Sequence, residues 1–282
     1  MMIVTEPVNV SQFKWTGRGA SLVVFAAVAL LLVLDAASSL VFAQAPGVKK
    51  TRPRPADFGN VVMNNASEPN GVAPVVFNHW LHRAKFTCRL CHVDIGFAMA
   101  ANATGIKEED NRNGLHCGAC HNGKVAFPAQ VHNAAGPDVK NCDRCHSMGK
   151  NVPREIDFAT FTAGFPKGRF GNNIDWEAVE VAGKATLVDT LPEISVRRRP
   201  LDIPVDYQIQ AKIAGLPEIV FSHRKHAVWN GCELCHPDIF AVKTGTTKYT
   251  MQDIFAGKYC GSCHGSVAFP AIDCQRCHTK PA

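Results

Sequence analysis

Six copies of one five-residue pattern constrain this chain more than any other feature. Each copy reads Cys-x-x-Cys-His, at residues 88–92, 117–121, 142–146, 232–236, 260–264 and 274–278. The copies use all twelve cysteines of the 282-residue chain, so none is left for a disulfide framework or a free catalytic thiol. These cysteines are Cys88, Cys91, Cys117, Cys120, Cys142, Cys145, Cys232, Cys235, Cys260, Cys263, Cys274 and Cys277.

The spacing within each copy matches c-type haem attachment. In one helical turn, two thiols three residues apart and the imidazole that follows them project to the same side. The thiols can add to the two vinyl groups of a haem while the imidazole binds its iron. Zinc ribbons and thioredoxin-type sites also use Cys-x-x-Cys pairs, but neither requires a His directly after the second Cys six times out of six. The sequence therefore predicts six haem c groups with six proximal iron ligands: His92, His121, His146, His236, His264 and His278.

The chain repeats itself at an offset of about 144 residues. The segment that begins at Phe77 with the pattern Phe-x-His-x-x-His matches the one that begins at Phe221, and residues 125–129 match residues 267–271. Each copy holds three motifs, which predicts triheme modules at 57–149 and 217–282. Long helical periodicity is absent and strand-like alternation is weak, so we expect a mainly α fold with much irregular loop and little β.

The connector at 150–216 contains neither Cys nor His. Its sequence predicts a helix over 174–182, with Asn173 as N-cap and Gly183 just beyond the end. We expect its aromatic residues to pack against a module, although a separate binding domain is an alternative. These aromatic residues are Phe158, Phe161, Phe165, Phe170 and Trp176.

The N-terminus predicts export. An apolar run at 20–34 follows Lys14 and Arg18 and precedes Ala43-Gln44-Ala45, the small-x-small pattern of a cleavage site. The run is shorter than the roughly 20 residues that span a bilayer. We therefore expect a signal peptide at 1–45, a mobile tail at 46–56 and a periplasmic location, with an uncleaved anchor at 20–42 as the alternative.

The formal net charge is +6, but the basic residues are scattered, apart from the run at 197–199. This pattern argues against nucleic acid as a partner. Six haems would add roughly twelve propionates, so we interpret the positive charge as partial compensation for the cofactors.

Six further His residues are available as distal iron ligands: His79, His82, His116, His132, His223 and His226. His79 and His82 are three residues apart, as are His223 and His226, so each pair lies on one helix face and can serve two neighbouring irons. The same pair precedes the first motif of both modules, which favours ligation.

Phe-x-His-x-x-His followed by three Cys-x-x-Cys-His motifs resembles the small triheme c-type cytochromes of the class III group, periplasmic electron carriers of metal- and sulfur-reducing bacteria. The resemblance covers both modules. It implies that the first His of each pair ligates the first haem and the second His the second haem. The implied pairs are His79 with His92, His82 with His121, His223 with His236, and His226 with His264.

The third haem of module one departs from the simple family pattern. In small family members its distal ligand lies shortly before the second motif, where this chain has His116. We expect His116 to serve the haem of Cys142, with Met99 and His132 as alternatives.

The third haem of module two departs further, because Tyr259 occupies the place of His116. In larger family members, a methionine from a Thr-Met segment is the distal ligand, and Thr250-Met251 resembles that segment. We expect Met251 to serve the haem of Cys274, with His132 or a core-packing role for Met251 as alternatives.

If every iron has two protein ligands, no position is open for a substrate. The sequence therefore predicts an electron-transfer relay, not an enzyme, that exchanges electrons with a quinol-oxidising membrane complex or other cytochromes. The alternatives are a multihaem reductase with one open haem and a membrane-anchored subunit of an oxidoreductase complex.

Overall fold

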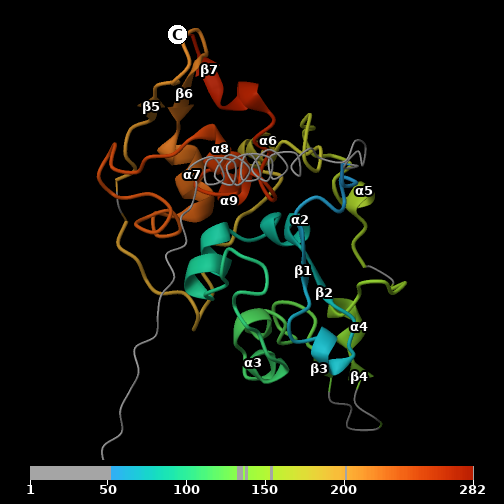
Figure 1. Ribbon diagram of the computed structural model, residues 1–282. Helices are drawn as coiled ribbons and strands as arrows, with labels where there is room; N and C mark the ends of the chain where they lie inside the picture. The colour runs from blue at the N-terminus through green and yellow to red at the C-terminus, as the bar shows by residue number, and fades with distance from the viewer. Residues whose placement is uncertain (1–51, 132–135, 137–138, 153–154, 201, 282) are drawn as a thin grey trace, which may run out of the picture. The chain divides into compact units, whose positions relative to one another are not determined.

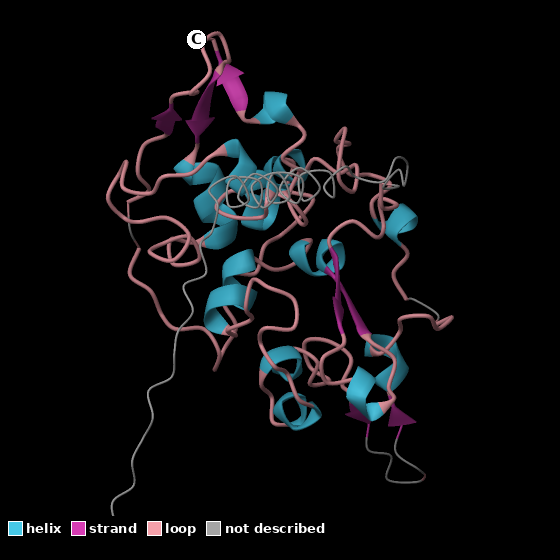
Figure 2. Ribbon diagram, in the orientation of Figure 1, coloured by secondary structure: helices cyan, strands magenta, loops and turns pink. Residues whose placement is uncertain are grey.

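Short helices joined by long loops make up most of this computed structural model (Figures 1 and 2). It describes residues 52–131, 136, 139–152, 155–200 and 202–281. The longest described helix, α7, has only eight residues. The α-helices are α2 (His79–Arg83), α3 (Glu108–Arg112), α4 (Cys142–Cys145), α5 (Phe158–Phe161), α6 (Trp176–Val181), α7 (His223–Asn230), α8 (Met251–Phe255) and α9 (Gly261–His264). The tighter or wider turns are η1 (Glu68–Asn70), η2 (Leu90–Asp94), η3 (His116–Ala119) and η4 (Cys274–Arg276).

Three small antiparallel sheets account for the described β-structure. Strand β1 (Asn60–Met63) pairs with β2 (Val75–Asn78), and β3 (Gln130–Val131) pairs with β4 (Val139–Lys140). The third sheet has the order β5 (Tyr207–Ile209), β6 (Glu218–Phe221), β7 (His278–Lys280). The predicted fold class, mainly α with much loop and little β, is confirmed.

Two strands deliver the His pairs to their helices. Strand β2 ends at Asn78 and α2 begins with His79, while β6 ends at Phe221 and α7 begins with His223. Both strands are rich in Val, Ile and Phe, which favour extended backbone. Each His pair therefore stands on the first turn of a helix whose direction a paired strand sets.

The repeat extends to details of the backbone. Helices α3 and α8 precede the second motif of their modules, and each is crossed closely by a motif glycine. A Cβ added at Gly118 would lie 1.9 Å from the carbonyl oxygen of Asn111, and one at Gly261 would lie 1.9 Å from that of Ile254. Only a residue without a side chain fits this crossing.

Five of the six motifs lie on short helical turns, as predicted. These turns are η2, η3, α4, α9 and η4. Residues 232–236 form hydrogen-bonded turns instead. Pro237 follows His236 directly and disfavours helical backbone at the residue before it, which explains the difference.

The connector helix begins later than the sequence predicts. Asp175, and not Asn173, is the N-cap of α6, and its carboxylate accepts a hydrogen bond of 3.2 Å from the Ala178 N–H. Ile174 is held in an antiparallel bridge with Lys167, which keeps it out of the helix. Gly183 follows the helix with a φ of 64°, as predicted.

The connector shares the described hydrophobic core with module one. Trp80 and Ala84 from α2 are buried against Ile174, Trp176 and Val179. Phe158, Phe161 and Phe165 pack on this cluster, which confirms the expectation for those rings and for Trp176. Phe170 instead lies under the Arg169 guanidinium, whose central carbon is 5.0 Å from the ring centroid.

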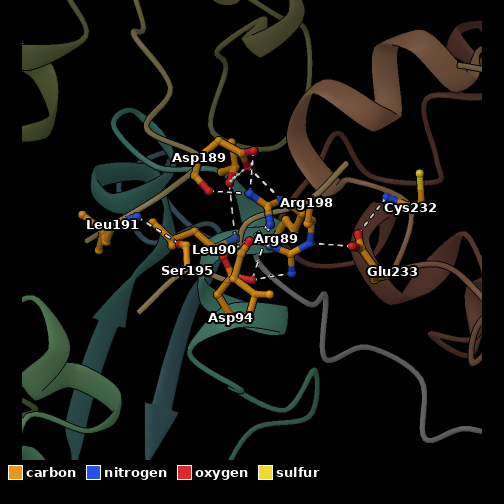
Figure 3. A network of polar contacts seen from close by, with 11 residues as sticks. Arg89, Leu90, Asp94, Asp189, Leu191, Ser195, Arg198, Cys232 and Glu233 are labelled. Atoms are coloured by element: carbon orange, nitrogen blue, oxygen red, sulfur yellow. Dashed lines mark hydrogen bonds and ion pairs between the residues drawn. The ribbon is translucent and has the colours of Figure 1, made fainter. Parts of the chain in front are cut away.

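A buried polar network also joins the connector to both modules (Figure 3). Arg89, within the first motif, bonds to Asp94 at 3.3 Å and to Asp189 of the connector at 2.5 Å. Arg198 of the connector bonds to Asp94 and to Glu233 of the fourth motif, both at 2.5 Å. The Asp94 side chain is fully buried, so its two arginine partners are required to offset the loss of water.

The expected signal peptide lies outside the described residues, as do residues 46–51 of the expected tail. Residues 53–56 belong to the described body, where Arg54 bonds to Asp57 at 2.6 Å. Among the residues that the structure describes, no helix has the length and apolar character needed to cross a membrane.

Replacing Asp94 with Ala should lower the free energy of unfolding by about 3 kcal/mol, because it removes the buried carboxylate that Arg89 and Arg198 share and leaves each with only a half-exposed partner. Thermal or denaturant unfolding of the haem-loaded protein measures this. The control is Glu108→Ala, which removes an exposed ion pair with Arg112 and should cost less than about 1 kcal/mol. Equal losses in the two variants would contradict a stabilising role for the network.

Candidate functional site

One large cavity runs through the described chain. Its volume is about 2600 Å³, several times the roughly 300–1000 Å³ of a single-ligand pocket. Eleven of the twelve motif cysteines line it, the exception being Cys232. His223 and His236 also lie outside its lining, although Cys235 of the fourth motif is part of it. The cavity has room for several large cofactors in contact with one another.

Three of the four expected His pairs are brought together. The ring centroids of His79 and His92 are 6.4 Å apart, with the ring planes 9° from parallel. Those of His82 and His121 are also 6.4 Å apart, and those of His226 and His264 are 6.1 Å apart. Two metal–nitrogen bonds of about 2 Å each, together with the distance from each ring centroid to its own nitrogen, add up to such a centroid separation. These spacings fit one iron between each pair of rings.

The first residue of Phe-x-His-x-x-His holds both His rings, a role that the sequence did not reveal. The Phe77 ring lies 4.8 Å from that of His79 and 4.3 Å from that of His82. In module two, the Phe221 ring contacts His223 at 5.0 Å and His226 at 4.3 Å. Edge-on contact with one ring and tilted or stacked contact with the other fix the angle between the two imidazoles.

Ten His rings are oriented by the backbone. In each, Nδ1 donates a hydrogen bond to a carbonyl oxygen, at distances from 2.7 Å for His79 to 3.1 Å for His223. Because a carbonyl oxygen only accepts, Nδ1 carries the proton and Nε2 keeps its lone pair for a metal. The ten are His79, His82, His92, His121, His146, His223, His226, His236, His264 and His278.

The third motif of each module folds back to the start of the module. His146 donates its Nδ1 proton to the carbonyl of Ala73, two residues before β2. His278 donates to the carbonyl of Pro217, directly before β6, and also pairs with Ile219 across the sheet. Each module is therefore closed by its last motif.

The repeated Val-Ala-Phe-Pro-Ala segment supports the second motif. The carbonyl of Phe127 accepts from His121 at 2.9 Å, and the Phe127 ring lies 4.4 Å from the imidazole. Phe269 makes the same contacts with His264, at 3.0 Å and 4.3 Å. The sequence match between residues 125–129 and 267–271 was the signal for this role.

Burial keeps the ring nitrogens neutral. Loss of water lowers the pKa of His79, His82 and His264 to about 4. The pKa of Cys91 and of Cys263 is raised to about 12 for the same reason. At neutral pH these imidazoles are uncharged, and each can donate a nitrogen lone pair to a metal. The two cysteine thiols would be protonated and therefore unreactive in a folded chain without haem.

His116 is the exception among the described His residues. Its Nδ1 is buried with no hydrogen-bond partner, and its ring lies 5.6 Å from that of Phe97. His116 and Tyr259 both adopt left-handed backbone, with φ of 47° and 53°, which supports their equivalence in the two modules. The structure does not show a ring contact between His116 and His146 in the part of the chain that it describes.

Met251 begins α8, at the position where module one has Glu108. Its side chain lines the cavity and is 39% exposed. Met99 also lines the cavity and is 42% exposed. The expected alternative ligand His132 lies outside the described residues.

The motifs differ in how far they reach the surface. The first cysteines of three motifs, Cys142, Cys232 and Cys274, are exposed, while the other nine are partly buried. These three belong to the third motif of each module and to the first motif of module two.

A family model and several solved structures match the sequence of this chain. The family model for cytochrome c7 and related cytochrome c matches residues 75–147 and 219–279. A solved c7-type three-heme cytochrome domain is 39% identical over 93% of its length and 27% of this chain, with a TM-score of 0.25. The C-terminal hexaheme fragment of GSU1996 is 26% identical over 99% of its length and 81% of this chain, with a TM-score of 0.25.

No curated protein matches the chain. The family model nevertheless matches once in each predicted module, and in both segments it includes the His pair and all three motifs. The two matched segments confirm the internal repeat. Both triheme modules are therefore those of a cytochrome c7-type multiheme cytochrome, and the six motifs bind six haem c groups.

Proposed function

We propose that this cytochrome is a periplasmic electron relay in which every haem iron has two protein ligands. The paired imidazoles carry this proposal, because each described pair leaves room for one iron and no open position beside it. Haem supplies a one-electron couple at its iron, and the chain sets the potential through axial ligands, burial and hydrogen bonds. An electron carrier, and not a substrate-converting enzyme, follows from closed coordination.

The distal ligands that we propose are His79, His82, His223 and His226. The contacts of Phe77 and Phe221 support the pairs in the two modules equally. The pair of His223 and His236 rests on this repeat, because the structure describes no direct contact between their rings.

For the third haem of module one we propose His116. Its unpartnered, buried Nδ1 supports a role in which the cofactor satisfies a nitrogen that the chain does not. For the third haem of module two we propose Met251, which stands at the cavity wall on the first turn of α8.

The exposed cysteines suggest where electrons enter and leave. Haems at Cys142, Cys232 and Cys274 would exchange electrons with other proteins, such as a quinol-oxidising membrane complex or further cytochromes. The haems at the other three motifs would carry electrons within the chain. Export to the periplasm by the N-terminal segment would place the protein where such partners meet.

Native mass spectrometry and absorption spectra test the relay directly. The mature chain should carry six haems that survive denaturation, because each has two thioether bonds. The spectra of the oxidised and the reduced protein should both show only low-spin haem, because two protein ligands on every iron give a strong ligand field. A high-spin fraction close to one haem in six would instead support a reductase with an open iron.

Replacing His223 with Ala should convert one haem of six to high-spin without loss of haem, because the thioethers and His236 still hold it. Absorption and electron paramagnetic resonance spectra measure the change. The control is Arg224→Ala, which alters the exposed neighbouring residue on α7. If His223→Ala stays fully low-spin, the ligand pairing is wrong.

Replacing Met251 with His should lower one reduction potential of the six. A thioether sulfur is a weaker donor to ferric iron than imidazole, so its replacement favours the oxidised form. The weak red absorption band of iron–methionine bonds should disappear from the oxidised protein, and potentiometric titration should show the shift. The same substitution at Met148, a half-exposed methionine outside the cavity lining, is the control, and an unchanged titration for Met251→His would leave Met251 a packing residue.

A further inference from the structure

Arg83 joins the three parts of the chain at one point. It is the last residue of α2 in module one and follows His82 directly. Its guanidinium carbon lies 4.5 Å from the ring centroid of Trp176 in the connector and 5.0 Å from that of Trp229 in module two. Its Nη1 donates a 3.0 Å hydrogen bond to the carbonyl of Val267, also in module two.

Arg83 carries a buried positive charge. Among the residues that the structure describes, no carboxylate pairs with it, and its Nε is buried without a hydrogen-bond partner. The other arginines around this site, Arg89, Arg198 and Arg276, all have carboxylate partners. Taking a cation out of water without a paired anion is costly, so this position calls for an anion from elsewhere.

The place where that anion belongs is the wall of the haem cavity, which Arg83 lines. Val267, the hydrogen-bond partner of Arg83, donates its own N–H to the carbonyl of Cys263 at 3.0 Å. Cys88 belongs to the first motif of module one, and Cys263 to the second motif of module two. Cys88, Cys235 and Cys263 all line this cavity, so attachment points from both modules share its wall.

We propose that Arg83 is the counter-ion of a haem propionate at the junction of the two modules, and that it is a positioning residue for electron transfer between them. Haem is the one anionic group that the family brings to this cavity. The charge of Arg83 favours the reduced form of the haems at Cys88 and Cys263, because an added electron is attracted to a nearby cation. The ion pair requires only that haem is attached to the motifs. The role of Arg83 in electron transfer between the modules rests in addition on the proposed relay function.

Only module one has an arginine at this position. The equivalent of Arg83 in module two is Ala227, because His226 corresponds to His82. A repeat copied without change would place an arginine at both positions. One arginine is sufficient for a contact between the two modules, because α2 of module one faces α7 of module two at Arg83 through Trp229.

The test compares Arg83→Met and Arg83→Gln with Arg83→Lys in the haem-loaded full-length protein. Methionine tolerates burial without a charge, glutamine keeps the polar character, and lysine keeps the charge. Arg169→Met is the matched control, because it removes the same charge from an exposed arginine that also lies over an aromatic ring. Haem count and spin state come first, and they test closed coordination independently.

Potentiometric titration followed by nuclear magnetic resonance of the haem methyl groups then gives the individual potentials. In Arg83→Met and Arg83→Gln, one or two haems of six should become about tenfold harder to reduce, which is a shift of about 59 mV for one electron. Arg83→Lys should retain most of the wild-type potentials, and Arg169→Met should leave all six within a small uniform change.

Two results would overturn the proposal. One is six bound haems with unchanged individual potentials in both neutral variants. The other is an equal shift in Arg83→Met and Arg169→Met, which would reflect net charge alone. A high-spin haem in the unaltered protein would instead count against the relay and leave the ion pair standing.

Discussion

The orientation of imidazole rings by backbone carbonyls is the constraint on which the rest of this structure depends. A ring that donates from Nδ1 can offer only Nε2 to iron, so each carbonyl position decides where an iron can stand. These carbonyls come from the ends of strands β1, β2, β5 and β6 or from residues next to them, and from the turns that follow the first two motifs of each module. Phe77 and Phe221 add the second restraint by fixing the angle between neighbouring rings.

A small side-chain core accompanies this arrangement. The described core consists mainly of Trp80, Trp176, Val179 and a few smaller residues, and it lies where the connector meets α2. Elsewhere the chain surrounds a cavity that haem fills, so apolar macrocycles replace side chains in the interior. The short helical turns that carry the motifs suffice, because two thioethers and an iron bond hold each of them in place of its own length.

Much of the site could be predicted from sequence, because haem attachment depends on residues next to one another in the chain. The internal repeat identified the two His pairs, because the same pair precedes the first motif of both modules. The partners of Asp94 and Arg83 could not be predicted, since Arg198 and Val267 lie more than 100 residues away. The start of α6 was misplaced because Ile174 is held by Lys167, a contact that local capping signals do not contain.

Strand β6 lies beside proposed ligands of all three haems of module two. Strand β6 follows Pro217, pairs with His278 and leads into His223 and His226. In module one, His146 likewise reaches back to Ala73, two residues before β2. A module cut off before its third motif would therefore lose the contact that ties its end to its first ligand-bearing strand.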